Sequence, residues 1–247
     1  MKTALITGAS SGIGKATAIA LAKLNIRLVL CGRRKEKLEE LQHDLRVEST
    51  ILTFDVRDKD AVLKAIGSLP ESFKNIDILV NNAGNAHGHG PVAEGALADW
   101  DAMMDSNVTG LLYVTKAVLP GMVERGSGHV VNLSSVAGKQ TYANGTVYCA
   151  TKKAVEAISE GIRLDHTEHG VKVTNIAPGA VETEFSEIRF KGDKAKAKSV
   201  YAGFEPLLAE DIADAIAYAV SVPDHVTIAD MTIYAKAQAA PTTVYRK

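Results

Sequence analysis

The chain has 247 residues, of which 46% are hydrophobic and 23% are charged, enough to bury a large core in one α/β domain. Lysine and arginine (28) nearly balance aspartate and glutamate (29), and the net charge of −1 excludes a basic field for nucleic acid or an anionic membrane. No segment reaches the roughly 20 apolar residues that span a bilayer. Cys31 and Cys149 fall inside apparent secondary elements, and the first residues lack a signal-peptide layout, so we expect a reduced, cytoplasmic protein.

Short apolar runs alternate with amphipathic segments along the whole chain. The runs are typical of strands buried on both faces and cover residues 4–7, 28–31, 51–54, 76–80, 129–134, 171–176 and 231–234. The predicted helices cover residues 16–24, 35–45, 60–66, 103–123, 146–169 and 209–220, and Pro120 should bend or shorten the fourth of them. This alternation predicts a single-domain α/β fold, a Rossmann-type doubly wound parallel sheet of about seven strands flanked by helices.

A glycine-rich turn, TGASSGIG, follows the first predicted strand and leads directly into a helix. Glycines let a backbone approach a pyrophosphate closely, and a helix N-terminus offers unpaired N–H groups to an anion. The spacing is GxxxGxG, unlike the general GxGxxG fingerprint, but its place at the first strand-to-helix crossing favours a phosphate site over a plain turn. The expected dinucleotide contacts are Gly8, Ser10, Ser11, Gly12, Ile13 and Gly14.

Tyr148 and Lys152, in the run YCATK, stand four residues apart and therefore on one face of a helix. A free phenol has a pKa of about 10, and lowering it by about three units needs roughly 4 kcal/mol. An ammonium about 4 Å away supplies energy of that order, so the pair would exchange a proton with an oxygen near neutral pH. Taken alone, the pattern is more typical of an ordinary exposed pair, so other motifs have to decide.

Five motifs in a fixed order resemble those of the short-chain dehydrogenase/reductase family: TGASSGIG, NNAG at 81–84, a serine thirteen residues before Tyr148, YCATK, and PGAVET at 178–183. The resemblance implies hydride transfer between a nicotinamide cofactor and a carbonyl or alcohol. It implies that Ser135 positions the carbonyl oxygen, that Tyr148 moves the proton, and that Lys152 lowers the pKa of Tyr148. Ser134 is the competing hydroxyl, and the family spacing selects Ser135.

The same resemblance implies further contacts. Asn107 would help, through its backbone, to hold a water near Lys152, where a helix-capping or plain buried amide is the alternative. Asp55 and Val56 would hold the adenine. The remaining expected cofactor contacts are Asn82, Ala83, Gly84, Tyr148, Lys152, Pro178, Gly179, Val181 and Thr183. For the residues of NNAG, the alternative is that they only stabilise the fold.

The end of the second strand predicts which dinucleotide is used. Gly32 stands where enzymes that prefer NAD usually carry a carboxylate, and Arg33 and Arg34 follow it. A carboxylate repels the 2′-phosphate of NADP, whereas guanidinium groups bind it. We therefore expect NADP(H), with Arg33 as the main phosphate ligand and Arg34 as a stacking or supporting partner. A solvated basic helix start is the alternative.

Segment 183–193, TEFSEIRFKGD, should belong to a mobile lid over residues 183–200, and its Arg189 would clamp a substrate carboxylate unless it is merely a solvated charge. With LPGMVERG at 119–126, this segment resembles the NADP-dependent 3-hydroxy acid dehydrogenases, which act on serine, L-allo-threonine and 3-hydroxypropionate-like acids. The implied substrate residues are Ser135, Tyr148 and Arg189. A reductase of acyl carrier protein-linked 3-oxoacyl groups or broad ketones is the alternative, and a non-catalytic NADP-sensing regulator is the alternative from another class.

The expected organisation places the cofactor half at about 1–135 and the catalytic and substrate half at about 136–247. The resemblance also implies a homotetramer, in which the long helices predicted over 103–123 and 146–169 pack against their mates. We expect no metal, because His87 and His89 have no apparent third ligand.

Overall fold

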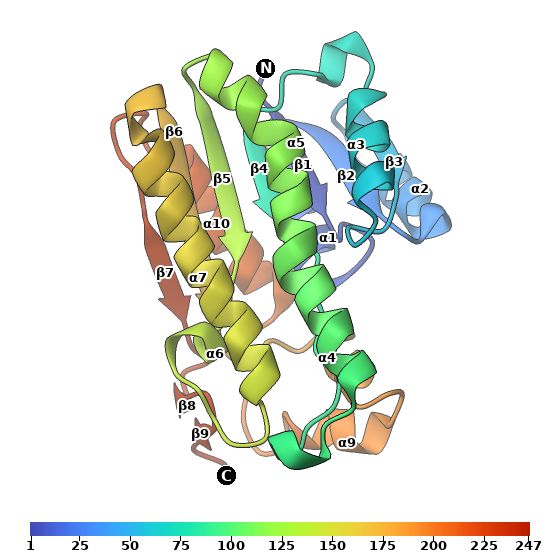
Figure 1. Cartoon of the computed structure of the whole chain (residues 1–247), viewed down its shortest axis with the longest axis vertical. Helices are drawn as coiled ribbons and strands as arrows, with labels where there is room; N and C mark the ends of the chain where they lie inside the picture. The colour runs from blue at the N-terminus through green and yellow to red at the C-terminus, as the bar shows by residue number, and fades with distance from the viewer.

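The computed structural model describes all 247 residues, and its centre is a sheet of seven parallel strands in the order β3-β2-β1-β4-β5-β6-β7 (Figure 1). The strands are β1 (Thr3–Thr7), β2 (Arg27–Gly32), β3 (Ser49–Thr53), β4 (Ile78–Asn81), β5 (Gly128–Leu133), β6 (Val171–Pro178) and β7 (Asp230–Ile233). Each predicted apolar run overlaps one strand, so the predicted fold class is confirmed. The strand order reverses where β1 meets β4, and ligands bind in the crevice beyond such a switch point.

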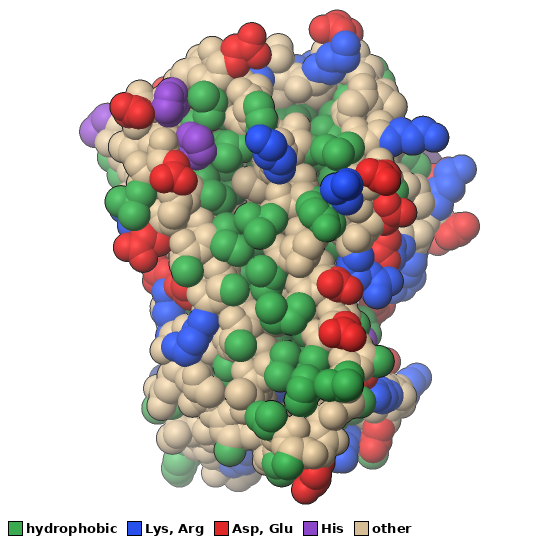
Figure 2. Space-filling view, viewed as in Figure 1, with side chains coloured by type: hydrophobic (Ala, Val, Ile, Leu, Met, Phe, Trp, Pro, Cys, Tyr) green, Lys and Arg blue, Asp and Glu red, His purple; other side chains and the backbone are tan.

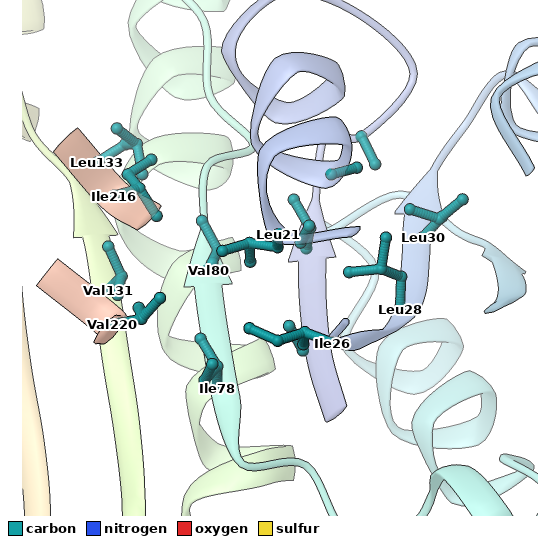
Figure 3. Packing of buried hydrophobic residues seen from close by; sticks show 14 of the residues in the cluster. Leu21, Ile26, Leu28, Leu30, Ile78, Val80, Val131, Leu133, Ile216 and Val220 are labelled. Carbon is teal, nitrogen blue, oxygen red and sulfur yellow. The ribbon is translucent and has the colours of Figure 1, made fainter. Parts of the chain in front are cut away.

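Helices cover both faces of the sheet, as the apolar strands require. Helices α1 (Gly12–Lys23), α2 (Lys35–Asp44) and α10 (Ala209–Ser221) pack on one face, and α3 (Lys59–Gly67), α5 (Gly110–Glu124) and α7 (Thr146–His166) pack on the other. Along β1, Ala4 and Ile6 join the first core and Leu5 joins the second. In the first core, Leu21 of α1 lies among strand side chains (Figure 3).

The predicted helix over 103–123 is divided in the structure. Helix α4 (Leu97–Met104) passes through a π-helical turn (Asp105–Thr109) into α5, which continues past Pro120 to Glu124. The expected shortening at Pro120 was wrong. Pro120 and Lys116, the residue whose carbonyl loses its helical partner, are both exposed, so water can hydrate that carbonyl. The interruption falls instead at Asn107.

Shorter elements surround the carboxyl ends of the strands. They are α6 (Val136–Lys139), α8 (Phe185–Arg189), α9 (Lys194–Ser199) and the antiparallel hairpin of β8 (Gln238–Ala240) and β9 (Thr243–Val244). Segment 183–200, the expected lid, thus contains two short helices. No helix has the length and apolar character needed to cross a membrane.

Candidate active site

A cleft of about 980 Å³ opens at the carboxyl ends of the strands, where the fold predicts a ligand site. It brings together all the expected site residues except Gly14 and Asn107, which lie behind its wall. The expected residues that line it are Gly8, Ser10, Ser11, Gly12, Ile13, Arg33, Arg34, Asp55, Val56, Asn82, Ala83, Gly84, Ser135, Tyr148, Lys152, Pro178, Gly179, Val181, Thr183 and Arg189.

The glycine turn has the geometry of a phosphate cradle. Gly8 and Gly12 adopt positive φ values of 68° and 50°, and a Cβ on Gly14 would lie 2.3 Å from the carbonyl oxygen of Gly8. Asn82 fixes the turn from β4 by donating from Nδ2 to the carbonyl oxygen of Thr7 at 2.9 Å. Ser11, the N-cap of α1, makes no side-chain cap, so the first N–H groups of α1 remain available to an anion. These features fit a bound pyrophosphate.

Arg34 lies closest to the turn. It donates to Ser10 Oγ at 3.1 Å, to Ser11 Oγ at 2.6 Å and to Glu184 at 2.9 Å. Lys37 contacts the same Glu184 carboxylate at 3.2 Å, and hydrogen bonds from these two cations hold the pKa of Glu184 below its usual value. Several cations therefore gather at the end of β2, and this donor set fits an additional phosphate group.

Asp55 holds two arginines together at the neighbouring strand end. Its carboxylate accepts from Arg57 at 2.7 Å and lies 3.6 Å from Arg33, and the hydrogen bond from Arg57 lowers the pKa of Asp55. Arg33 keeps 66% of its side chain exposed. The carboxylate of Asp55, expected to hold the adenine, is thus already engaged by arginine, while Arg33 faces solvent.

Tyr148 and Lys152 are both buried on α7 and face the cleft. Nζ of Lys152 lies 5.9 Å from the centre of the Tyr148 ring and donates to the carbonyl oxygen of Leu133 at 2.8 Å. Burial raises the pKa of Tyr148 and lowers that of Lys152 to about 8, against the opposing influence of Glu156. The expected lowering of the phenol pKa by Lys152 is therefore wrong, because desolvation outweighs the hydrogen bond from Ser135 and the attraction of the nearby Arg189 charge.

The two serines after β5 make different hydrogen bonds. Ser134 is buried and donates to the carbonyl oxygen of Lys152 at 3.2 Å. Ser135 is the N-cap of α6, accepts from the amide of Ala137 at 3.1 Å, and its side chain lowers the pKa of Tyr148. The structure therefore couples Ser135, and not Ser134, to the phenol.

Asn107 acts as a buried connector between elements. Its Oδ1 accepts from the amide of Asn85 at 2.8 Å, while Nδ2 donates to the Asn85 carbonyl at 2.8 Å and to Thr151 Oγ1 at 3.1 Å. These bonds tie the segment after β4 to α7, one residue before Lys152. Both Nδ2 hydrogens are engaged in these bonds, so the side chain has no donor left for the cleft.

Arg189 lines the cleft at the end of α8. Its guanidinium carbon lies 5.6 Å from the ring centre of Tyr148 and 5.7 Å from that of Tyr142. Its Nε and Nη2 atoms are closed to solvent and have no hydrogen-bond partner. Leaving buried charged donors unpaired costs free energy, so the group is arranged for an anion in the cleft.

Several residues of the site were not predicted from the sequence. Tyr142 and Phe185 frame the phenol, and the Phe185 ring lies 5.7 Å from that of Tyr148. Gln238 is buried and accepts from the amide of Ala180 at 2.8 Å, which holds the loop after β6. Tyr142 could have been suspected, because it is an aromatic residue only six positions before Tyr148. Nothing in the tail sequence indicated Gln238.

The tail continues beyond Gln238 along the cleft. Arg246 donates to the carbonyl oxygens of Val200 and Ala202 and stacks over Phe204, and the Lys247 amide donates to Gly203. Val244 and Arg246 line the cleft. The tail therefore supports segment 200–204 and contributes to the wall of the site.

Comparisons with known proteins agree with this geometry. The pattern of the family described as short chain dehydrogenase matches residues 2–194. The NADP-dependent 3-hydroxy acid dehydrogenase of Schizosaccharomyces pombe is 41% identical, over 100% of this chain and 97% of its own. The serine 3-dehydrogenase of Agrobacterium fabrum is 45% identical, over 92% of this chain and 90% of its own. A closed serine dehydrogenase solved with NADP+ superposes with a TM-score of 0.95 at 41% identity, covering 99% of this chain and 100% of its own. The chain belongs to the short-chain dehydrogenase family.

Proposed function

We propose that this protein is an NADP(H)-dependent oxidoreductase that transfers a hydride between the cofactor and the 3-hydroxy group of a small hydroxy acid. The observation that carries the proposal is Arg189, whose unpaired guanidinium atoms lie beside Tyr148. A carboxylate bound there would give the guanidinium its missing partners and hold the rest of a short substrate against the phenol. The names of the similar enzymes, which specify 3-hydroxy acids and serine, support the same class.

The proposed cofactor contacts follow the strand ends. Gly8, Ser10, Ser11, Gly12 and Ile13 would hold the pyrophosphate, supported from behind by Gly14. Arg33 and Arg34 would bind the 2′-phosphate. Asp55 and Val56 would flank the adenine, and Asn82, Ala83 and Gly84 the ribose. Pro178, Gly179, Val181 and Thr183 would close over the nicotinamide. When bound, NADP(H) supplies or accepts the hydride.

The chain's own residues would handle the proton and the oxygen. In reduction, the phenol of Tyr148 gives its proton to the carbonyl oxygen as charge develops there, and the Ser135 hydroxyl orients that oxygen. Burial keeps the resting phenol protonated, which is the form needed to donate. Lys152, charged at neutral pH, would stabilise the phenolate left behind and contact the ribose, and Asn107 would fix the segment beside it. Oxidation reverses the path of the proton.

The proposal is tested with a substrate panel followed by NADPH absorbance, comparing L-serine, L-allo-threonine and 3-hydroxypropionate with sugars, steroids and acyl thioesters. We expect turnover of the hydroxy acids and a rise of about tenfold or more in their KM in the Arg189→Ala variant. Unchanged KM for these acids would remove Arg189 from the site. Preference for acyl thioesters or broad ketones would favour the carbonyl reductase alternative, and cofactor binding without any turnover would favour a regulator.

We further propose a homotetramer built on the face formed by α5 and α7. Figure 2 shows hydrophobic side chains gathered along this face, and Leu112 and Leu164 are among the large apolar residues exposed there, at 43% and 70%. Covering such a stripe would remove it from water. A light-scattering mass near 26 kDa would contradict the proposal.

We also propose a reducing, cytoplasmic location, which is supported by the two cysteines, both free and buried.

A further inference from the structure

The turn that ends α8 places a lysine where helices normally use glycine. The amide of Gly192 donates to the Glu187 carbonyl at 2.8 Å and that of Lys191 to the Ile188 carbonyl at 3.1 Å, the two bonds of a Schellman ending. Lys191 occupies the left-handed position of this motif, with φ of 52°. A side chain there costs conformational free energy that glycine would not. The position therefore points to a role for the lysine side chain.

That side chain crosses the cleft wall to α4. Nζ of Lys191 lies 2.9 Å from Oδ2 of Asp99, whose side chain is only 19% exposed. Gly88, in the loop after β4, donates its amide to the carbonyl oxygen of Arg189 at 3.1 Å, and a Cβ on Gly88 would lie 3.2 Å from Asp99 Oδ2. The two contacts are therefore adjacent. Figure 1 shows α4 and the segment leading to α9 at the same end of the molecule.

Both contacts act on the segment that holds Arg189, the residue proposed to bind the substrate carboxylate. Arg189 is two residues before Lys191, and its guanidinium has no hydrogen bond on Nε or Nη2 to hold it in place. Its position between Tyr142 and Tyr148 therefore depends on where the end of α8 is fixed. A helix of five residues is only marginally stable by itself. Its start is held by Phe185 against Tyr148 and by Ser186 against Tyr201, so the contacts of Gly88 and Lys191 are what fix its end.

We propose that the Lys191–Asp99 ion pair positions Arg189 for the substrate carboxylate, and thereby sets the preference for carboxylate over uncharged substrates. This inference rests on the proposed function of Arg189. Lys191 and Asp99 act through Arg189 and touch neither the cofactor nor the reacting oxygen, so they are positioning residues. The pair joins the turn after α8 to α4. Its loss would let the end of α8 that carries Arg189 shift, while Phe185 at the start of α8 stays packed against Tyr148.

The decisive variant is Lys191→Gly, because glycine suits the left-handed turn and the variant should fold at least as well as the wild type. We expect KM for 3-hydroxypropionate to rise about five- to tenfold, while kcat, KM for NADP+ and KM for the uncharged 3-hydroxypropionamide stay within about twofold. Asp99→Asn should give the same pattern. Lys191→Arg, which keeps the positive charge facing Asp99, should have nearly the wild-type KM for 3-hydroxypropionate. Asp101→Asn, at an exposed position on the same helix, is the matched control.

The outcomes separate this inference from the proposed function. If Arg189→Ala leaves KM for 3-hydroxypropionate unchanged, Arg189 does not bind the carboxylate, and the part of the proposed function on which this inference rests fails. If Arg189→Ala raises it but Lys191→Gly does not, only the positioning role is overturned, and Lys191 is merely a helix end. In the Arg189→Ala background, Lys191→Gly should add nothing further, and an additive effect on both substrates would likewise overturn the role.

Discussion

Lys152 donates a hydrogen bond from Nζ to the carbonyl oxygen of Leu133, the last residue of β5, at 2.8 Å. This bond fixes the ammonium at the carboxyl end of a central strand, next to the residues that follow it into the cleft. Burial nevertheless disfavours its charge and lowers its pKa to about 8. A group with that pKa changes its charge within the working range of most enzymes, so its titration should be visible in the kinetics.

We expect kcat/KM for reduction to fall as pH rises through about 8, because Lys152 is charged below that value and neutral above it. The carboxylate of Glu156, one turn further along α7, raises the pKa of Lys152. Glu156→Gln should therefore shift the alkaline limb of the profile to lower pH. Glu160→Gln, one turn further on and exposed, should leave the limb in place. A limb that does not move in Glu156→Gln would contradict the assignment to Lys152.

Tyr148→Phe should reduce kcat by about a hundredfold to ten-thousandfold, the usual contribution of a general acid. The dissociation constant of NADPH, measured by fluorescence, should change by less than about twofold, since the ring and its packing against Phe185 remain. Tyr218→Phe, at a side chain that is 60% exposed, is the control. Substantial residual turnover in Tyr148→Phe would refute its role as the proton donor.

Arg34→Ala should raise KM for NADPH about ten- to hundredfold and leave KM for NADH nearly unchanged, because charge-assisted hydrogen bonds to a phosphate contribute about 1.5–3 kcal/mol. Arg33→Ala should act in the same direction. The control is Lys35→Ala, at the exposed position next to Arg34, where the lysine pairs with Glu39. It should change KM for NADPH and KM for NADH equally little. A wild-type enzyme that prefers NADH would sink the assignment of both arginines.

Stability should depend on His129 in mild acid. Burial lowers its pKa from 6.5 to about 3, and Nε2 pairs with Thr174 Oγ1 at 2.7 Å. The unfolded chain therefore binds a proton between these values that the folded chain does not, and folding stability falls as pH drops below about 6.5. His129 alone should account for a loss of about 2 kcal/mol between pH 7 and about pH 5.

Urea unfolding at the two pH values measures this effect. His129→Gln should make the free energy of unfolding less dependent on pH by about that amount, whatever its effect at pH 7. His225→Gln, at an exposed site, should retain the wild-type dependence. Equal dependence in the wild type and in His129→Gln would show that His129 does not titrate as its burial requires.

The sheet and the contents of the cleft could be predicted from the sequence because their signals are local. The apolar runs mark buried strands, and the turn at Gly8 to Gly14 carries its steric reason in its glycines. The division of the helix at Asn107 could not be predicted, since it depends on bonds to Asn85 and Thr151. Pairings such as Arg34 with Glu184, 150 positions apart, also leave no periodic signal.

The pKa of Tyr148 shows a different limit. Its spacing from Lys152 was visible in the sequence, but the depth of the phenol and the attachment of Lys152 to Leu133 were not. Spacing along a helix determines which side chains share a face, whereas desolvation depends on everything packed around that face. The direction of a pKa shift therefore required the tertiary structure.

The attachment of Gln238 to Ala180, and of Arg246 to Val200, has a consequence for how this enzyme can change. These residues shape the wall of the cleft from outside the main sheet and carry none of the motifs that define the chemistry. Mutations in the last ten residues can therefore alter which acids fit while the hydride and proton steps persist. A directed-evolution library confined to the motif residues would miss this route, and one spanning 239–247 would sample it while keeping the contact of Gln238 with the loop after β6.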